Sequence, residues 1–241
     1  MGGSNETLSL KAAAAVAHIE PNELRHTAQR GEIDAMLRGG EWYFLRRDID
    51  EWMQRHLLSA REKELAKCHR SMADERRRRG MAASGMLVGS LLREDCISLS
   101  LAAKAKPGVV RDMTDLAARC GLVYDEESLF RELLAREEAA STAIGEGVAF
   151  LHPRYHDPYM FEDSFIAYAR SERPVFFGAP DGAGTRHFFL ICANDRDLHL
   201  HVLARLAVLA HGAGLVAKLD EAASSGDVMA AVREAEAEYA K

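Results

Sequence analysis

The chain has 241 residues, of which 48% are hydrophobic, and its formal net charge is -6. This length accommodates one large domain, or one domain of ordinary size with a smaller one attached. The negative charge argues against a protein covered in basic surface, so any contact with nucleic acid is expected to be local.

The four cysteines lie far apart and form no C-x-x-C pair: Cys68, Cys96, Cys120 and Cys192. This spacing fits neither a zinc framework nor a small disulfide-bonded scaffold. The apolar run LSLKAAAAVAHI near the start contains Lys11 and His18, and it is too short to cross a bilayer. We therefore expect a cytoplasmic protein with reduced thiols, no membrane contact, and no metal or other cofactor.

The amino-terminal part has the pattern of two short helices, a hairpin and a closing helix. The run LSLKAAAAVAH predicts the first helix, and a second helix is predicted from Pro21 to Gly31. Gly39 and Gly40 supply the positive φ that a tight turn needs between the two flanks of AMLRGGEWYFL. Asp48 is expected to cap the closing helix.

Residues 58–90 are predicted to form a charged helical linker. Between residues 61 and 79 the bases outnumber the acids 8 to 4, and no proline or glycine interrupts the stretch. This pattern predicts an exposed helix that joins two globular parts. Leu58, Leu65 and Met72 recur every seven residues, as in a coiled coil. A homodimer held by this seam therefore stands beside the simpler interpretation of a solvated connector.

The remainder of the chain mixes helices with several strands, which indicates an α/β layer domain. CISLSLAA alternates apolar and polar residues as a half-buried strand does. Asp125 is expected to cap the helix EESLFRELLAREEA. The stretch STAIGEGVAFLHPR is expected to form one glycine-marked strand that ends near His152. Further strands are predicted at PVFFGA and RHFFLICA, and helices at HLHVLARLAVLAHGA and DVMAAVREAEAEYA.

Residues 1–57 resemble the excisionase or MerR-related winged helix-turn-helix module. The matching parts are the alanine-rich first helix, Pro21, the RGEI turn, the GGEWYF hairpin and the DIDEW helix. Such modules place the second helix in the major groove and the wing against the DNA backbone. The resemblance therefore implies DNA contacts by Asn22, Arg25, His26, Gln29 and Arg30, with Arg38 and Arg46 near the wing.

The charge of this module supports DNA binding less well than the resemblance does. Within residues 1–60 there are 7 bases against 9 acids, and the resulting charge of -2 attracts phosphates poorly. A module that contacts protein instead of DNA therefore remains an alternative. Trp42, Tyr43 and Phe44 offer rings that stack on bases, but in so small a hairpin we expect them to fill the core.

Residues 91–241 carry the motifs LLAREEAASTAIGEGVAFLHP, PVFFGAPDGAGTRHFFLICA and DLHLHVLARLAVLA in this order. They resemble the type-2 enzyme IIA domain of the bacterial phosphotransferase system, closest to its nitrogen-regulatory branch. The resemblance implies a mixed β-sheet flanked by helices. It also implies a phosphoryl carrier, not an enzyme that turns over a small substrate, with HPr or an HPr-like nitrogen-branch phosphocarrier as its partner.

The resemblance assigns four site residues. His152 matches the phosphoryl acceptor, His199 matches a second histidine, and Arg136 and Thr142 match groups around the phosphoryl oxygens. The chemistry suits these residue types, because a neutral imidazole is nucleophilic near neutral pH and a guanidinium offers paired donors to phosphate. We expect His152 to stand at an accessible strand edge, with Gly145 allowing a close backbone approach.

Several residues depart from the family pattern or lack a partner pattern. Phe150 and Leu151 stand where the family usually has Ile-Pro, a change expected to relax the turn before the acceptor. His201 follows His199 by two residues, and on a helix the two point to different sides. His156 and His187 are expected at the surface or at a strand edge.

These features predict a cytoplasmic regulator of the nitrogen type, phosphorylated on His152 and coupled to a DNA-binding module. One alternative is an adaptor that docks proteins such as a sensor kinase or a transporter and ignores DNA. Another is a sugar-transport IIA component, although the chain carries no IIB-like cysteine loop or membrane domain. The helix-turn-helix module also argues against transport.

Overall fold

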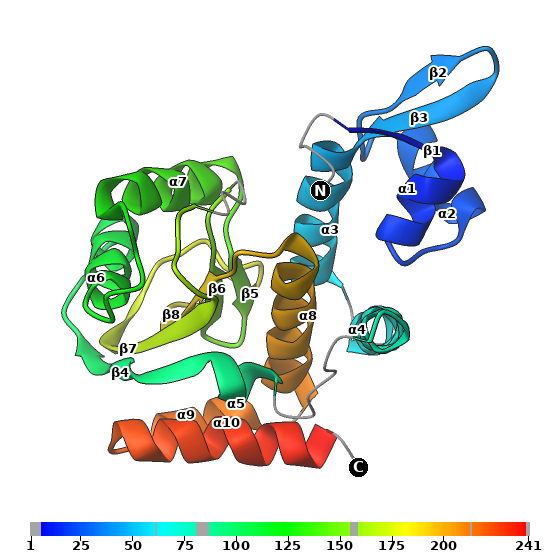
Figure 1. The fold of residues 1–241 in the computed structure, drawn as a ribbon. Coiled ribbons are helices and arrows are strands. Elements are labelled where there is room, and N and C mark those ends of the chain that lie inside the picture. Colours follow the sequence, from blue (N-terminus) through cyan, green and yellow to red (C-terminus); the bar gives the residue numbers. More distant parts are fainter. Residues whose placement is uncertain (1–5, 61, 81–86, 155–158, 213, 240–241) are drawn as a thin grey trace. The chain divides into compact units, whose positions relative to one another are not determined.

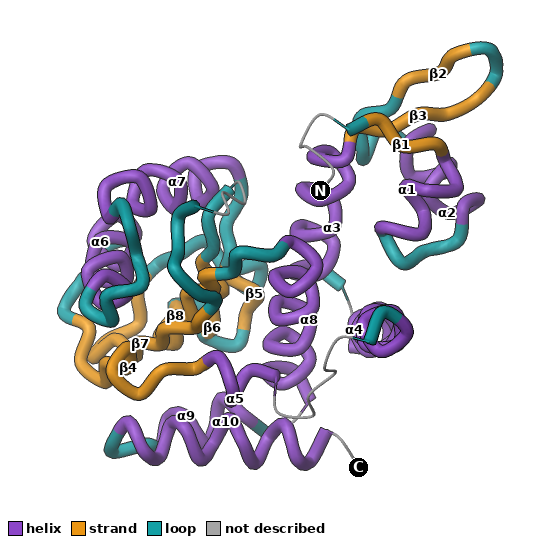
Figure 2. The backbone as a smooth tube through the Cα atoms, in the orientation of Figure 1, coloured by secondary structure: helices purple, strands orange, loops and turns teal. Residues whose placement is uncertain are grey.

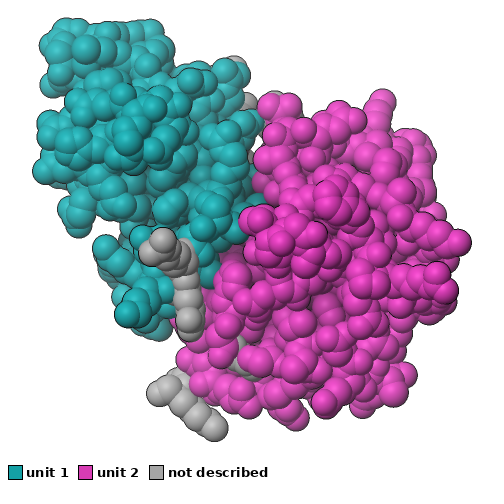
Figure 3. All heavy atoms as spheres, turned by 180° about the vertical axis from the view of Figure 1, so that it is seen from behind, with its two compact units in different colours: residues 1–80 teal, residues 81–241 magenta. Residues whose placement is uncertain are grey.

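The structure is a computed structural model, and the chain divides into two compact units. Unit 1 is Met1–Gly80 and unit 2 is Met81–Lys241 (Figure 3). The structure describes every residue except 1–5, 61, 81–86, 155–158, 213 and 240–241.

Unit 1 consists of a three-stranded antiparallel sheet and helices (Figure 1). Its elements are β1 (Thr7–Ser9), α1 (Leu10–Val16), α2 (Pro21–Gln29), β2 (Met36–Arg38), β3 (Glu41–Leu45), α3 (Arg46–Ser59) and α4 (Glu62–Arg78). The strand order is β1-β3-β2, with β3 in the centre. Gly39 and Gly40 join β2 to β3 with φ values of 58° and 85°, which confirms the predicted turn.

Two local predictions in unit 1 are wrong. Helix α3 begins at Arg46, after Leu45, so Asp48 lies inside the first turn, where its charge favours the helix dipole, and does not cap the helix. In the hairpin only Phe44 is fully buried, while Trp42 and Tyr43 are half-buried. The pleat explains why Tyr43 differs from Phe44, because successive residues of a strand point to opposite sides.

Helix α4 spans most of the predicted linker, but it is not exposed on all sides. Leu65, Cys68 and Met72 are buried, whereas Arg77 and Asp74 form an exposed ion pair with a separation of 2.8 Å. The seven-residue spacing of the apolar positions therefore marks the buried face of the helix. A homodimer remains a prediction.

Unit 2 is a five-stranded mixed sheet with helices on both faces, as predicted (Figures 1 and 2). Its elements are α5 (Leu87–Leu91), β4 (Leu92–Leu101), α6 (Lys106–Ala118), α7 (Glu126–Ala139), β5 (Ala143–Gly145), β6 (Val148–Leu151), β7 (Phe165–Val175), β8 (Thr185–Cys192), α8 (Arg196–Gly212), α9 (Leu215–Glu221) and α10 (Ser225–Tyr239). Asp125 caps α7 as predicted, because its side chain accepts a hydrogen bond from Ser128 N at 2.9 Å.

The strand order is β4-β7-β8-β6-β5. Strands β4 and β7 are parallel, as are β6 and β8, while the β7–β8 and β5–β6 pairs are antiparallel. Helices α6 and α7 cover one face, and α8, α9 and α10 lie on the other side (Figure 1). Phe188 and Leu190 of β8 pack with Val110 and Met113 of α6 in the core of the first face.

Two strand predictions in unit 2 are wrong. The stretch before His152 forms a hairpin instead of one strand, because Gly145, Glu146 and Gly147 all adopt positive φ and turn the chain between β5 and β6. The strand predicted at PVFFGA lies earlier, as β7. It stops at Val175, and the following Phe176 is 77% exposed.

In the part of the chain that the structure describes, no single helix has the length and apolar composition needed to cross a membrane. Helices α8 and α9 meet these two criteria only as a pair bent by 80°.

Candidate functional site

His152 follows the last residue of β6. All four residues of β6 are buried, and the strand is held beside β8 in parallel register, with Leu151 opposite Leu190. The imidazole itself is 0% exposed. The predicted accessible position is therefore wrong, because side chains from α7 and α8 lie against the ring.

Arg136 contributes the contact from α7. Its Nε donates to His152 Nε2 at 3.0 Å, and one terminal nitrogen donates to the carbonyl of Ala140 at 2.8 Å. The last carbonyls of a helix have no partner within the helix, so the end of α7 provides an acceptor for the guanidinium. This second bond holds Arg136 in place against the ring.

The hydrogen bonds of His152 define its tautomer. The Nδ1 atom lies 2.8 Å from the carbonyl oxygen of Phe150. A carbonyl only accepts, so Nδ1 carries the proton, and a guanidinium only donates, so Nε2 presents a lone pair. Nε2 is thus the nucleophilic atom of the ring.

His199 contributes the contact from α8. Its ring centroid lies 4.8 Å from that of His152, with an angle of 57° between the two planes. His199 lies in the first turn of the helix, where its backbone N–H donates to Asp195 O at 2.9 Å. His201 is also buried, but a separation of two residues places it on a different side of α8.

Thr142 is engaged by a residue that the sequence did not single out for this site. Its Oγ1 donates to Glu137 Oε2 at 2.6 Å, and its backbone N–H lies 3.0 Å from the same oxygen. The Glu137 carboxylate also accepts from Lys106 Nζ at 2.8 Å. The Thr142 hydroxyl therefore donates its hydrogen bond to Glu137. The available signal was the Arg-Glu pair at 136–137, because consecutive charges at a helix end require partners when buried.

Four candidate DNA contacts share one face of α2. Asn22, His26 and Gln29 are exposed, and Arg25 is half-buried. Arg25 donates to Asn22 Oδ1 at 3.0 Å, and His26 donates to Gln29 Oε1 at 3.1 Å. Spacings of three and four residues place side chains on one side of a helix. The structure therefore brings these four residues together.

The remaining three candidates differ in their surroundings. Arg30 forms an exposed ion pair with Glu32, and the hydrogen bond between them raises the pKa of Arg30. Arg38 is exposed at the end of β2, beside the wing turn. The Arg46 Nε is 3.1 Å from Asp50 Oδ1, and the side chain is only 17% exposed. Arg46 therefore does not share the open position of Arg38.

Comparison with known proteins decides the family. The sequence model described as "Phosphoenolpyruvate-dependent sugar phosphotransferase system, EIIA 2" matches residues 90–235, which is more than half of the chain. The chain belongs to this family. A second family, described as "Helix-turn-helix domain", matches residues 7–57. We refer to the two matched regions as the IIA domain and the helix-turn-helix domain.

Curated relatives match the IIA domain. A "Nitrogen regulatory protein" of Bradyrhizobium diazoefficiens is 31% identical over 137 residues, which cover 56% of this chain and 86% of that protein. The "PTS system fructose-specific EIIABC component" of Bacillus subtilis is 30% identical over 126 residues. That match covers 52% of this chain but only 19% of the Bacillus protein, so the chain spans about a fifth of that relative.

Solved structures give the same fold. The nitrogen regulatory protein IIA-Ntr from Neisseria meningitidis is 28% identical with a TM-score of 0.55, and the match covers 61% of this chain and 99% of that one. IIA mannitol from Escherichia coli is 20% identical with a TM-score of 0.51, and it covers 58% of this chain and 97% of that one. The mannitol protein supports the fold alone.

His187 occupies a second polar cluster in the IIA domain, and its predicted surface position is wrong. The residue is 1% exposed. Its Nδ1 lies 2.8 Å from the Tyr168 hydroxyl, and its Nε2 lies 3.3 Å from Asp220 Oδ1. Burial lowers the pKa of His187 to about 4, although the nearby Asp220 opposes this shift. His156, which was assigned the same surface position, lies outside the described residues.

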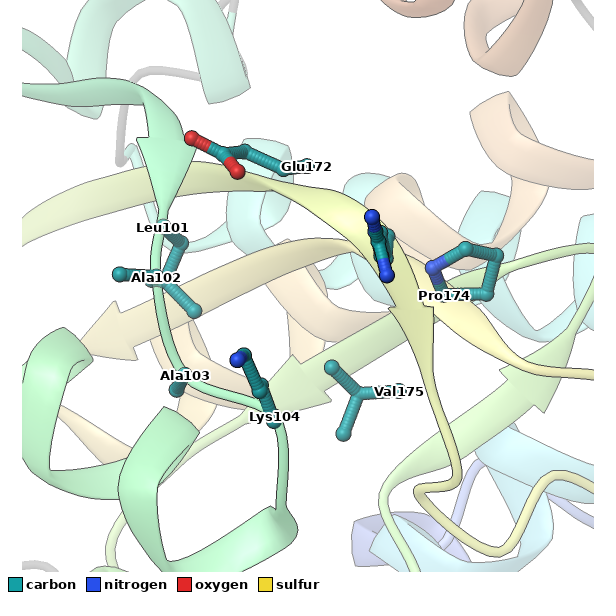
Figure 4. Close-up of a pocket in the computed structure, with 8 residues that line it drawn as sticks. Leu101, Ala102, Ala103, Lys104, Glu172, Pro174 and Val175 are labelled. Atoms are coloured by element: carbon teal, nitrogen blue, oxygen red, sulfur yellow. The ribbon is translucent and has the colours of Figure 1, made fainter.

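Other surface features of the IIA domain are separate from the His152 cluster. A pocket of about 360 Å³ is lined by residues 101–104 and 172–175, where β4 ends beside β7 (Figure 4). None of Arg136, His152 and His199 lines this pocket.

Within the described ranges, no group of three or more His, Cys, Asp or Glu side chains is arranged to hold a metal ion.

Proposed function

We propose that the protein is a phosphotransferase-system regulator of the nitrogen type, in which His152 accepts a phosphoryl group from HPr or an HPr-like nitrogen-branch carrier. The observation that carries this proposal is the arrangement of Arg136 and His199 around a His152 ring whose Nε2 presents its lone pair. The phosphorylation state of His152 would change what the helix-turn-helix domain binds. In this role the chain carries a group between proteins and does not turn over a small substrate.

The transfer step follows from the tautomer of His152. The Nε2 lone pair attacks phosphorus, a new N–P bond forms, and the bond between phosphorus and the carrier breaks. The Nδ1 proton stays on its hydrogen bond to Phe150, so the ring does not need to lose a proton during transfer. Arg136 and His199 offer donors for the phosphoryl oxygens, which bear the negative charge.

Arg136 must also release the acceptor. In the unphosphorylated protein its Nε donates to the lone pair that attacks, and both side chains are buried. Transfer therefore requires the guanidinium to leave Nε2 and to bond to the incoming phosphoryl group. Planar paired donors suit this exchange, since they match the spacing of phosphate oxygens.

The helix-turn-helix domain supports a role in DNA binding. Asn22, Arg25, His26 and Gln29 share one side of α2, and the hairpin has an exposed Arg38 beside its turn. Recognition of the major groove by a second helix uses such a polar face. The adaptor alternative remains testable, because binding to a protein partner by unmodified chain, with no DNA binding at any salt concentration, would favour it.

The test of phosphorylation uses the full chain with purified, phosphorylated nitrogen-branch carrier. We expect the intact mass to rise by one phosphoryl group and the label to be acid-labile, as phosphohistidine is. His152→Asn should take up no label. His211→Asn is the matched control, since His211 is a partly exposed residue at the end of α8. Equal labelling of wild type and His152→Asn would refute the assignment of the acceptor.

A second candidate function is transport. The 30% identity to a fructose-specific EIIABC component favours a IIA component that passes its phosphoryl group onward to a IIB domain. Transfer from phosphorylated chain to a fructose-type IIB domain in a purified mixture would support this candidate. The regulatory proposal predicts no such transfer.

A further inference from the structure

Two neighbouring residues of α7 connect to the two nitrogens of the His152 ring. Arg136 donates directly to Nε2. Glu137 reaches Nδ1 through a chain of hydrogen bonds: Thr142 donates its hydroxyl and its N–H to the carboxylate, Phe150 N donates to Thr142 O at 3.1 Å, and His152 Nδ1 donates to Phe150 O at 2.8 Å. The chain thus joins the end of α7 to the strand that presents the ring.

The Glu137 carboxylate is a stable anchor for this chain. Its side chain is 2% exposed, and a buried carboxylate requires hydrogen bonds and an opposite charge. Thr142 supplies two donors, and Lys106 Nζ supplies the charge at 2.8 Å. Lys106 also lies over the Phe177 ring, 5.0 Å from the centroid, and its side chain is 32% exposed. Lys106 is therefore the end of the network that is closest to solvent.

We infer that Glu137 and Lys106 are positioning residues that hold His152 in the tautomer with a protonated Nδ1 and an unprotonated Nε2. This inference rests on the proposed role of His152 as phosphoryl acceptor. The Phe150 carbonyl holds the proton on Nδ1 only while β5 and β6 keep their positions. Thr142 fixes the start of β5, and Glu137 fixes Thr142.

The consequence of losing the carboxylate follows from the chemistry of imidazole. A neutral imidazole carries its single proton on either nitrogen, and the hydrogen bond at one nitrogen decides which. When the Phe150 carbonyl is no longer fixed, only the Arg136 donor still favours an unprotonated Nε2, so a larger part of the population protonates Nε2 and loses the lone pair that attacks phosphorus. Neither positioning residue touches the phosphoryl group, so they act through the acceptor ring.

The test measures the ring nitrogens by ¹⁵N NMR in the full chain without any phosphoryl donor. We expect wild type to show protonated Nδ1 alone, and Glu137→Gln and Lys106→Met to show both tautomers. Glu127→Gln is the matched control, because this glutamate also lies on α7 and is ion-paired, with Arg111 at 2.7 Å, but is exposed. Thr142→Val should resemble Glu137→Gln, and Thr142→Ser should restore the wild-type pattern.

A second readout is the rate of phosphotransfer from the carrier. Loss of a residue that orients a reacting group slows a reaction by roughly tenfold to a hundredfold, and we expect this range for Glu137→Gln. The control Glu127→Gln should transfer at the wild-type rate. A folded Glu137→Gln with wild-type tautomer and rate would overturn the inference. If Glu137→Gln does not fold, Lys106→Met serves in its place, because it alters only the end of the network that is closest to solvent. A wild-type tautomer and rate for Lys106→Met would then overturn the inference.

The inference and the proposed function fail in different ways. If wild type takes up no phosphoryl group but Glu137→Gln changes the tautomer of His152, the acceptor role is refuted and the positioning role is supported. If wild type is phosphorylated on His152, and Glu137→Gln has the same rate and the same tautomer, the acceptor role is supported and the positioning role is refuted.

Discussion

The two units place their candidate functional residues in opposite environments. In the helix-turn-helix domain, Asn22, His26 and Gln29 are exposed on one side of a helix. In the IIA domain, His152 and His199 are 0% exposed. An exposed polar side chain is satisfied by water, whereas a buried one requires an internal partner. The internal partners of a buried histidine therefore indicate its chemical role, whereas an exposed face indicates only which ligands it is able to contact.

The largest effect is expected from the cation at the buried site. Arg136→Ala should lower the rate of phosphotransfer to His152 by about a hundredfold to a thousandfold, the usual cost of removing one donor that stabilises charge in a transition state. Arg136→Lys should recover part of the rate, since it keeps the charge but not the paired donors. Stopped-flow or quench kinetics with the phosphorylated carrier measure this. A rate within twofold of wild type for Arg136→Ala would remove Arg136 from the site.

The buried His187 predicts an effect of pH on the free energy of unfolding, not on phosphotransfer. The pKa of His187 is about 4 in the folded chain and about 6.5 when unfolded, so the unfolded state binds the proton more tightly. The stability from neutral His187 is complete above pH 6.5 and declines as the pH falls to 4. A difference of about 2.5 pKa units corresponds to roughly 3 kcal/mol.

Denaturant unfolding of the IIA domain at pH 7 and pH 4.5 measures this effect. His187→Gln should lose less stability than wild type over this interval, because glutamine does not titrate. Equal losses in both proteins would show that His187 does not bind its proton more weakly in the folded state. Phosphotransfer by His187→Gln at pH 7 should stay near the wild-type rate, in contrast to the loss expected for Arg136→Ala.

The smallest effect is expected for DNA binding by the polar face of α2. Arg25→Ala should weaken DNA binding by about 1 kcal/mol and, if Arg25 contacts a phosphate, should lower the salt dependence by about one charge. Arg93→Ala removes an exposed arginine from the IIA domain and serves as the control. Gel-shift titrations over a salt series measure both. Identical affinity and salt dependence for Arg25→Ala and wild type would separate this helix face from DNA binding.

Local signals in the sequence predicted several elements correctly. Pro21 begins α2, Asp125 caps α7, and Gly39 with Gly40 turns the wing hairpin, as expected. Each of these residues acts through its own backbone or through a partner a few positions away. The mixed sheet flanked by helices was expected from the family motifs, and the strand order confirms it.

Two of the wrong predictions concern burial that depends on distant segments. The surface position expected for His187 failed because Tyr168 and Asp220, far away in the sequence, complete a buried cluster. Strand β7 was placed too late because its first residues, 165–169, are buried on both faces and show no alternation. Neither fact is visible within a window of a few residues.

The candidate site divides in the same way. His152, Arg136 and His199 were selected from motifs, and the structure brings all three together. Thr142 was selected as well, but its hydroxyl binds Glu137. Lys106 carried no signal at all, since it lies 31 residues from its partner in the chain. Motifs identify the residue types of a site, whereas the hydrogen bonds that orient them require the fold.

The most direct measurement of the central claim is the identification of the phosphorylated atom. The full chain, labelled with ¹⁵N in its histidines, is phosphorylated by the carrier, and coupling between ³¹P and ¹⁵N is recorded. The hydrogen bond from Nδ1 to Phe150 predicts that phosphorus is bonded to Nε2 of His152. A phosphoryl group on Nδ1 of that ring, or on any other residue, would contradict the account.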